Sequence, residues 1–131
     1  MRRHITLVEI PAPKGRDINY ELQWLGNSLG LFGERDKDKS CFRVFITLVK
    51  EARRRPLSSD QIAEQLTLSR GTVVHHIHHL VDSGMVEQVR GGYSLRMENL
   101  QMLIEEMHRD AEHMFQRMKK ISEEIDKMLG L

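Results

Sequence analysis

The chain has 131 residues, the length of one compact domain or of a small domain with an oligomerising arm. Hydrophobic residues make up 40% and charged residues 30%, which excludes disorder throughout, and only 5% are aromatic, which argues against a sugar-binding or base-stacking surface. The 20 Lys and Arg residues against 19 Asp and Glu give a formal net charge of +1, a balance that by itself argues against nucleic-acid binding.

The charges are unevenly distributed along the chain. Residues 1–40 carry seven basic and six acidic side chains, and residues 98–131 carry five basic and eight acidic ones. Residues 41–97 carry eight basic and five acidic side chains, together with four of the seven histidines. The neutral total therefore combines a basic middle with an acidic end.

No apolar run approaches the roughly 20 residues that span a bilayer, and the Met-Arg-Arg-His start is not followed by a long apolar stretch of the secretory type. The single cysteine, Cys41, excludes an intrachain disulfide and a thiolate metal cluster. We expect a cytoplasmic protein with no membrane segment.

The first predicted elements are a strand and a helix. Residues 4–10 are rich in β-branched side chains and predict a short strand, which Pro11 and the residues after it end. Residues 17–29 predict a helix, because Ile18, Leu22, Leu25 and Leu29 form one apolar stripe. Gly30 and Gly33 close this helix, and the charged run 34–39 predicts a solvated turn.

A second helix is predicted from Cys41 to Arg54, with Ser40 as its N-cap and Pro56 as its stop. Its predicted buried face consists of Phe42, Phe45, Leu48, Val49 and Ala52. A short third helix follows, capped by Ser58 or Ser59, with Ile62, Ala63 and Leu66 as its apolar face.

After a tight connection at Thr67-Leu68, Ser69 caps a predicted helix that runs to Ser83 and ends at Gly84. Residues 86–90 and 93–97 predict two short strands. The Gly91-Gly92 pair between them predicts a two-residue hairpin turn of type I′, which needs positive φ at both positions.

The last segment, residues 98–131, predicts one long helix because it contains no Pro and no Gly before Gly130. Apolar residues recur at alternating steps of four and three, which is the pattern of a coiled-coil seam. This predicted dimerisation seam consists of Leu100, Ile104, Met107, Ala111, Met114, Met118, Ile121, Ile125 and Met128.

Residues 41–97 thus give the order helix, helix, turn, helix, hairpin. We predict a mainly α fold, in which a winged helix-turn-helix precedes a long C-terminal dimerisation helix. A helix fits the major groove of DNA, and its N-terminus directs backbone N–H groups at phosphate. The predicted domains are an N-terminal strand and helix on the dimer arm (1–40), a DNA-binding unit (41–97) and a coiled-coil arm (98–131).

The helix after Ser69 separates into two faces. Its predicted core side holds Val73, Ile77, Leu80 and Val81. Its outward face is polar and rich in donors, and a small Gly71 would let the helix end approach the groove closely. The predicted DNA contacts are Ser69, Arg70, Gly71, Thr72, Val74, His75 and His78 on the helix and Arg90, Tyr93 and Arg96 on the wing.

Residues 69–86 and the wing segment Gly91-Gly92-Tyr-Ser-Leu95 resemble the recognition helix and wing of ArsR/MarR-type winged-helix transcription regulators. Thr72-Val73, His76-Ile77, Leu80 and Gly84-Met85-Val86 carry the resemblance, and residues 61–66 resemble the family's first helix-turn-helix helix. The whole is similar to archaeal regulators of this type. The sequence lacks the Cys-x-Cys pair of the metal-sensing members, and its His-rich recognition face is unusual.

Three features have alternative interpretations. His75 and His79 have the i, i+4 spacing of two metal ligands, but zinc needs three or four, so we predict no metal and no cofactor. Cys41 could be a redox sensor near a helix N-terminus, although a buried apolar role is favoured. The run 53–55 fits either a solvated helix end or a clamp on the DNA backbone.

The sequence therefore predicts a homodimeric, double-stranded-DNA-binding transcription regulator that recognises a pseudo-palindromic site. Repression by blocking the polymerase is the simplest outcome. The pattern leaves open a parallel, antiparallel or mixed dimer arm, and a small-molecule effector to which no residue is assigned. The alternative is a winged-helix protein-interaction module in a transcription or replication assembly. No catalytic arrangement stands out, so an enzyme is not expected.

Overall fold

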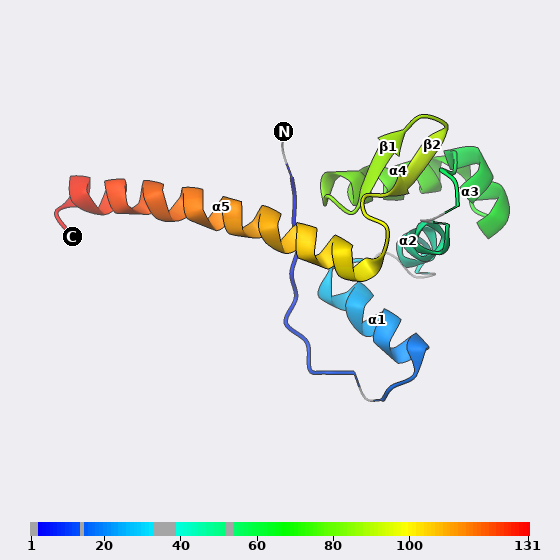
Figure 1. Ribbon diagram of the computed structural model, residues 1–131, viewed down its shortest axis with the longest axis horizontal. Helices are drawn as coiled ribbons and strands as arrows, with labels where there is room; N and C mark the ends of the chain where they lie inside the picture. The colour runs from blue at the N-terminus through cyan, green and yellow to red at the C-terminus, as the bar shows by residue number, and fades with distance from the viewer. Residues whose placement is uncertain (1–2, 14, 33–38, 52–53) are drawn as a thin grey trace.

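The computed structural model describes residues 3–13, 15–32, 39–51 and 54–131. Within these residues the chain forms five helices and one antiparallel two-stranded hairpin, which confirms the predicted fold class of a winged helix-turn-helix followed by a long helix (Figure 1). The elements are α1 (Ile18–Ser28), α2 (Ser40–Lys50), α3 (Ser59–Leu66), α4 (Arg70–Asp82), β1 (Val86–Val89), β2 (Gly92–Leu95) and α5 (Leu100–Leu129).

The predicted strand at residues 4–10 is wrong. The segment is extended, but it pairs with no strand among the described residues. Its backbone is tied instead to the ends of helices, because the N–H groups of His4 and Val8 donate to the carbonyls of Asp82 and Ser28, each at 2.9 Å. The β-branched composition thus predicted extended backbone correctly, but it could not indicate what the backbone bonds to.

Helix α1 lies within the predicted range. Asp17 caps it, and its carboxylate accepts from the N–H of Asn19 at 2.7 Å. The predicted stripe packs progressively along the helix: Ile18 is exposed, Leu25 packs against the core, and Leu29 is buried. Gly33 and residues 34–38 of the predicted turn lie outside the described residues.

Helix α2 differs from its prediction at both ends. Ser40 is the first helical residue rather than the N-cap, and Lys39 occupies the cap position with a left-handed backbone. The helix ends at Lys50, before the predicted end at Arg54. Phe45 and Leu48 are buried as predicted, whereas Ala52 and Arg53 lie outside the described residues.

Caps define the helix-turn-helix as the sequence predicted. Ser58 accepts from the N–H of Gln61 at 3.1 Å, and the Gln61 side chain accepts from the N–H of Ser58 at 2.8 Å, a reciprocal capping box. Ser69 caps α4 by accepting from the N–H of Thr72 at 3.1 Å. Between the helices, Thr67 takes a left-handed conformation that turns the chain.

The hairpin loop lies one residue earlier than predicted. Val89 pairs with Gly92, so Arg90 and Gly91 form the connection and Gly92 is the first residue of β2. A type I′ turn needs positive φ at both loop residues. Of the two, Gly91 has positive φ and Arg90 does not, so the predicted type I′ turn is wrong. Gly92 is required in the strand because a Cβ there would collide with the backbone carbonyl of Leu57.

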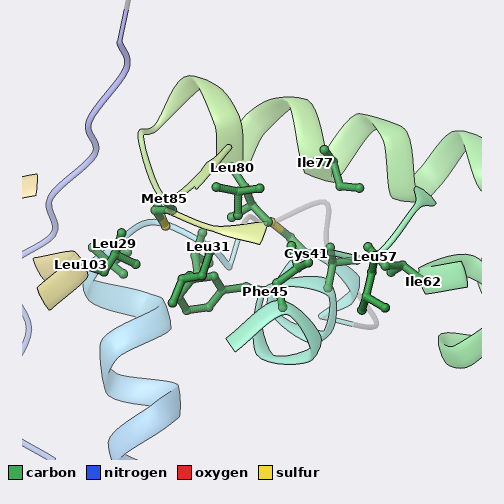
Figure 2. Packing of buried hydrophobic residues seen from close by; sticks show 14 of the residues in the cluster. Leu29, Leu31, Cys41, Phe45, Leu57, Ile62, Ile77, Leu80, Met85 and Leu103 are labelled. Carbon is green, nitrogen blue, oxygen red and sulfur yellow. The ribbon is translucent and has the colours of Figure 1, made fainter. Parts of the chain in front are cut away.

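The core joins all of these elements. Phe45 of α2, Ile62 of α3 and Ile77 of α4 are almost wholly buried, and Leu57 closes the core where its backbone pairs with that of Tyr93. Figure 2 shows Leu29 from the end of α1 beside Leu103 of α5, next to the same apolar cluster. The start of α5 is therefore part of the subunit's own core.

This packing corrects part of the predicted dimer seam. Met107 is buried in the subunit's own core, so it is not available to a partner as predicted, whereas Leu100 is only partly buried against that core. The sequence missed Leu103, which is fully buried one residue off the predicted stripe. Beyond Met114, by contrast, every residue of α5 is exposed, and this part of the helix projects away from the winged helix (Figure 1).

Candidate nucleic-acid interface

The helices α2 and α3 hold α4 from one side. Val73, Ile77 and Leu80 are buried against them, which leaves the opposite side of α4 exposed. The Ser40 hydroxyl lies 2.6 Å from Nε2 of His76, so a polar contact also ties α4 to the first turn of α2. His76 is at intermediate exposure, at the edge of the apolar face of α4.

The outward face of α4 brings several predicted contact residues together. Arg70, Gly71, His75 and His78 are exposed, while Thr72 and Val74 flank them at intermediate exposure. A Cβ on Gly71 would meet nothing within 4 Å, so the backbone of the first turn is open to a ligand. The face therefore offers one guanidinium and two imidazoles on a rigid helix.

The first turn of α4 is held in place by its own cap. The Ser69 hydroxyl donates to Oγ1 of Thr72 at 2.8 Å while it accepts from the backbone of that residue. These contacts fix the side chains beside the helix N-terminus, where unpaired N–H groups and the helix dipole favour an anion such as phosphate.

Asp60 is a neighbour that the sequence pattern did not single out. Its carboxylate lies 3.4 Å from Nε of Arg70, and both side chains are more than two-thirds exposed. An exposed ion pair of this kind contributes little to stability, so a phosphate can compete for Arg70. Asp60 lies in the first turn of α3, and only the folded structure brings it to the start of α4.

The wing presents Arg90 at its exposed tip, as predicted. Tyr93 is half-buried. Its backbone N–H donates to the Leu57 carbonyl at 2.8 Å, and its carbonyl accepts from the Leu57 N–H at 3.0 Å. This bridge ties the base of the wing to the chain just before α3. Of the three predicted wing contacts, Arg90 is thus the one that stands clear of the protein.

Arg96 lies elsewhere than predicted. Its guanidinium donates to the Asp110 carboxylate at 2.6 Å and to the Gly84 carbonyl at 3.3 Å, and it lies 3.8 Å from Glu106. Arg3 binds the same Asp110 at 2.5 Å. The side chain of Arg96 is 18% exposed and joins the wing to α5, so it is not presented to phosphate.

These contacts shift the ionisation of the network. Burial acts to raise the pKa of Asp110, but the hydrogen bond and charge of Arg96, with the charge of Arg3, outweigh burial and lower this pKa. The hydrogen bond to Asp110 likewise raises the pKa of Arg96. The charged side chains of Arg96, Asp110 and Arg3 therefore stabilise one another, and they join the wing, α5 and the N-terminal segment.

The alternative sites show less organisation. Among the described residues, no group of three or more His, Cys, Asp or Glu side chains is placed to hold a metal ion. Cys41 is buried within the core, as its apolar interpretation predicts. Arg54 and Arg55 are exposed beyond α2, and Arg53 of the same run lies outside the described residues.

Comparison with known families supports the assignment of this unit. Residues 38–89 match the family model described as a helix-turn-helix domain, a segment that contains α2, α3, α4 and β1. The domain indicates a DNA-binding regulator of the general type that the sequence resembles, and no curated protein matches the chain. None of the described helices is both long and apolar enough to cross a bilayer.

Proposed function

We propose that this protein is a non-enzymatic regulator of transcription, which binds double-stranded DNA in the cytoplasm by inserting α4 into the major groove. The observation that carries the proposal is the outward face of α4. A helix-turn-helix domain presents Arg70, His75 and His78 there together, with no acidic residue among the exposed positions of the first two turns. This face suits both phosphate and the acceptor-rich edges of bases.

The side chains divide by the contacts they can make. Ser69, Arg70 and Thr72 surround the N-terminus of α4 and suit the DNA backbone, which fixes the position of a protein on the duplex. Gly71, Val74, His75 and His78 suit the base edges, because a neutral imidazole offers both a donor and an acceptor. Arg90 reaches the flanking backbone from the tip of the wing, with Tyr93 beside the base of the same hairpin.

The proposed unit of action is a homodimer that binds a pseudo-palindromic site and represses by excluding the polymerase. Residues 41–97 act as the DNA-binding domain, residues 98–131 as the dimer arm, and residues 1–40 brace the arm. The apolar residues of α5 beyond the core support this division, since Met118, Ile121 and Ile125 are 44–53% exposed in the single chain. A small-molecule effector stays a prediction without an assigned residue.

Selection from a pool of random DNA duplexes tests the proposal. The full chain is incubated with the pool at about 150 mM salt, and the bound fraction is sequenced over several rounds. We expect an enriched motif with two related half-sites, bound with an affinity that falls as salt increases. If no motif is enriched and weak binding disappears at moderate salt, the chain is instead a protein-interaction module.

A further inference from the structure

The outer part of α5 carries an apolar stripe that none of the described residues covers. Phe115 is 57% exposed and Leu129 is 68% exposed, beside the half-exposed Met118, Ile121 and Ile125. A shallow groove runs along Phe115, Met118 and Ser122. A helix that projects into solvent with such a stripe needs a partner helix, because tertiary packing provides most of a helix's stability.

The stripe has two edges of different chemistry. In heptad notation, positions a and d form the seam and positions e and g flank it. The a positions are Ala111, Met118 and Ile125, and the d positions are Met114, Ile121 and Met128. One edge, at position e, holds Phe115, Ser122 and Leu129, whereas the other edge, at position g, holds Asp110, Arg117 and Glu124.

A parallel pair of these helices would place unlike edges together. In a parallel coiled coil, position g of one helix faces position e of the next heptad in its partner. Asp110 would then face Phe115 of the partner subunit, and Glu124 would face Leu129 of the partner subunit. Asp110 already binds Arg3 and Arg96 of its own subunit, but this arrangement would set the exposed Glu124 against an apolar side chain and would leave Arg117 opposite Ser122 of the partner subunit.

We infer that the outer part of α5 pairs antiparallel with the same segment of a second copy of the chain. The inference rests on the proposed homodimer and specifies its geometry. In an antiparallel pair the two e edges meet and bury Phe115 and Leu129, while the two g edges meet on the opposite side. Arg117 then faces Glu124 of the partner subunit, and the two-fold axis repeats this opposite-charge pair.

The Arg117 pairing also fixes the register of the two helices. It sets Ala111 in the same layer as Met128 of the partner subunit, and Met118 in the same layer as Ile121 of the partner subunit. A shift by one heptad would bring Glu124 against Glu124 of the partner subunit. The register thus pairs the outer residues, from about 108 to 131, and leaves Leu103 and Met107 in the core of their own subunit.

Disulfide mapping tests the orientation. In an antiparallel pair, an Ala111→Cys chain mixed with a Met128→Cys chain forms a cross-linked dimer on mild oxidation, whereas each variant alone does not. Ala111 and Ala111 of the partner subunit would lie about 25 Å apart, because the helix rises 1.5 Å per residue, and a disulfide needs Cα atoms within about 7 Å. Oxidised wild type, with only the buried Cys41, is the matched control.

Two results would overturn the inference. Rapid self-linking of Ala111→Cys and of Met128→Cys would show a parallel pair, and a chain that sediments as a monomer at micromolar concentration would show no pair. Sedimentation of the reduced variants, together with circular dichroism, confirms that each one folds and assembles like wild type. DNA binding of the same variants is measured separately. A parallel dimer that still binds its selected motif would contradict the antiparallel orientation but not the proposed DNA-binding function.

Discussion

Arg70 and Asp60 set the charge at the start of α4. Each side chain is more than two-thirds exposed, and their contact distance is 3.4 Å. In the free protein Asp60 neutralises the cation nearest the helix N-terminus, and on DNA the same carboxylate would lie close to phosphate. If the proposed interface is correct, we expect Asp60 to reduce both the non-specific attraction to DNA and the affinity of the specific complex.

Replacement of Asp60 by Asn tests this role. We expect Asp60→Asn to bind the selected duplex several-fold more tightly, because removal of one acidic group near phosphate strengthens the electrostatic part of binding. Fluorescence anisotropy over a salt series measures the change. The control is Glu64→Gln, one turn further along α3, which we expect to have a smaller effect. Equal affinities of Asp60→Asn and wild type would contradict the placement of DNA at this end of α4.

A substitution at Gly92 tests how the base of the wing is packed. The Gly92 φ of +143° is unfavourable for other residues, and a Cβ would collide with the Leu57 carbonyl. We expect Gly92→Ala to lower the free energy of unfolding by about 2 kcal/mol or more. Gly71→Ala is the control, because it adds the same methyl group to an open helical position. For Gly71→Ala we expect the free energy of unfolding to increase by about 0.5–1 kcal/mol. Urea unfolding measures both variants.

At the scale of elements, the Arg3–Asp110–Arg96 network joins three separate parts of the chain. Arg96 follows β2, Asp110 lies in α5, and Arg3 belongs to the extended N-terminal segment. The figure shows this segment crossing α5 (Figure 1). The network thus fixes the direction in which the arm leaves the winged helix.

Removal of the shared carboxylate tests the network. The pKa of Asp110 is lowered in the folded state, so its stabilising contribution is present above about pH 5 and is lost as the pH falls. We expect Asp110→Asn to cost about 1–3 kcal/mol at pH 7 and to flatten the acid dependence of unfolding. Glu112→Gln is the control, since Glu112 is exposed and lies 3.6 Å from the exposed His108, outside the Asp110 network. If the free energy of unfolding changes with pH by the same amount in wild type and Asp110→Asn between pH 7 and 3, the stabilising role of the Asp110 carboxylate is contradicted.

Local patterns predicted the elements well and their long-range contacts poorly. The Ser58 and Ser69 caps and the buried face of α4 follow from periodicity and cap chemistry, which act within a few residues. The contacts of Ser40 with His76 and of Arg96 with Asp110 could not be predicted, because these partners are distant in sequence. The hairpin shifted by one residue for the same reason, since Leu57 determines where a glycine is needed.

The division of α5 could not be predicted from its heptads either. One uninterrupted pattern covers residues that pack into the subunit, such as Met107, and residues that project from it, such as Met118. Periodicity identifies the apolar face of a helix but not what covers that face. The burial of Leu103 marks the part of the helix that belongs to the winged-helix core.

At the scale of the molecule, the near-neutral net charge is compatible with DNA binding because the charges are segregated. The basic middle of the sequence coincides with the helix-turn-helix domain, and the acidic end coincides with α5. We expect the overall attraction to DNA to be weak, so that the specific affinity of the proposed dimer depends more on base contacts and on the geometry of its two subunits.

The antiparallel arm predicts the spacing of the half-sites. The start of α5 lies about 30 Å from the centre of the proposed pair, so the two starts lie about 60 Å apart. Each winged helix sits at the end of α5 remote from the C-terminus (Figure 1). We therefore expect half-sites separated by about two turns of B-DNA rather than one. Footprinting of the selected duplex measures this spacing, and half-sites one turn apart would contradict the antiparallel arm.

The central claim is that the outward face of α4 reads DNA, and one binding measurement tests it directly. The variant combines Arg70→Ala, His75→Ala and His78→Ala, three exposed positions, and the control is His108→Ala, an exposed histidine on α5. Both are titrated with the selected duplex at fixed salt and pH. We predict at least a 100-fold loss of affinity for the triple variant, at about 1–3 kcal/mol per lost base contact, and no loss for His108→Ala. A folded triple variant that binds like wild type would contradict the account.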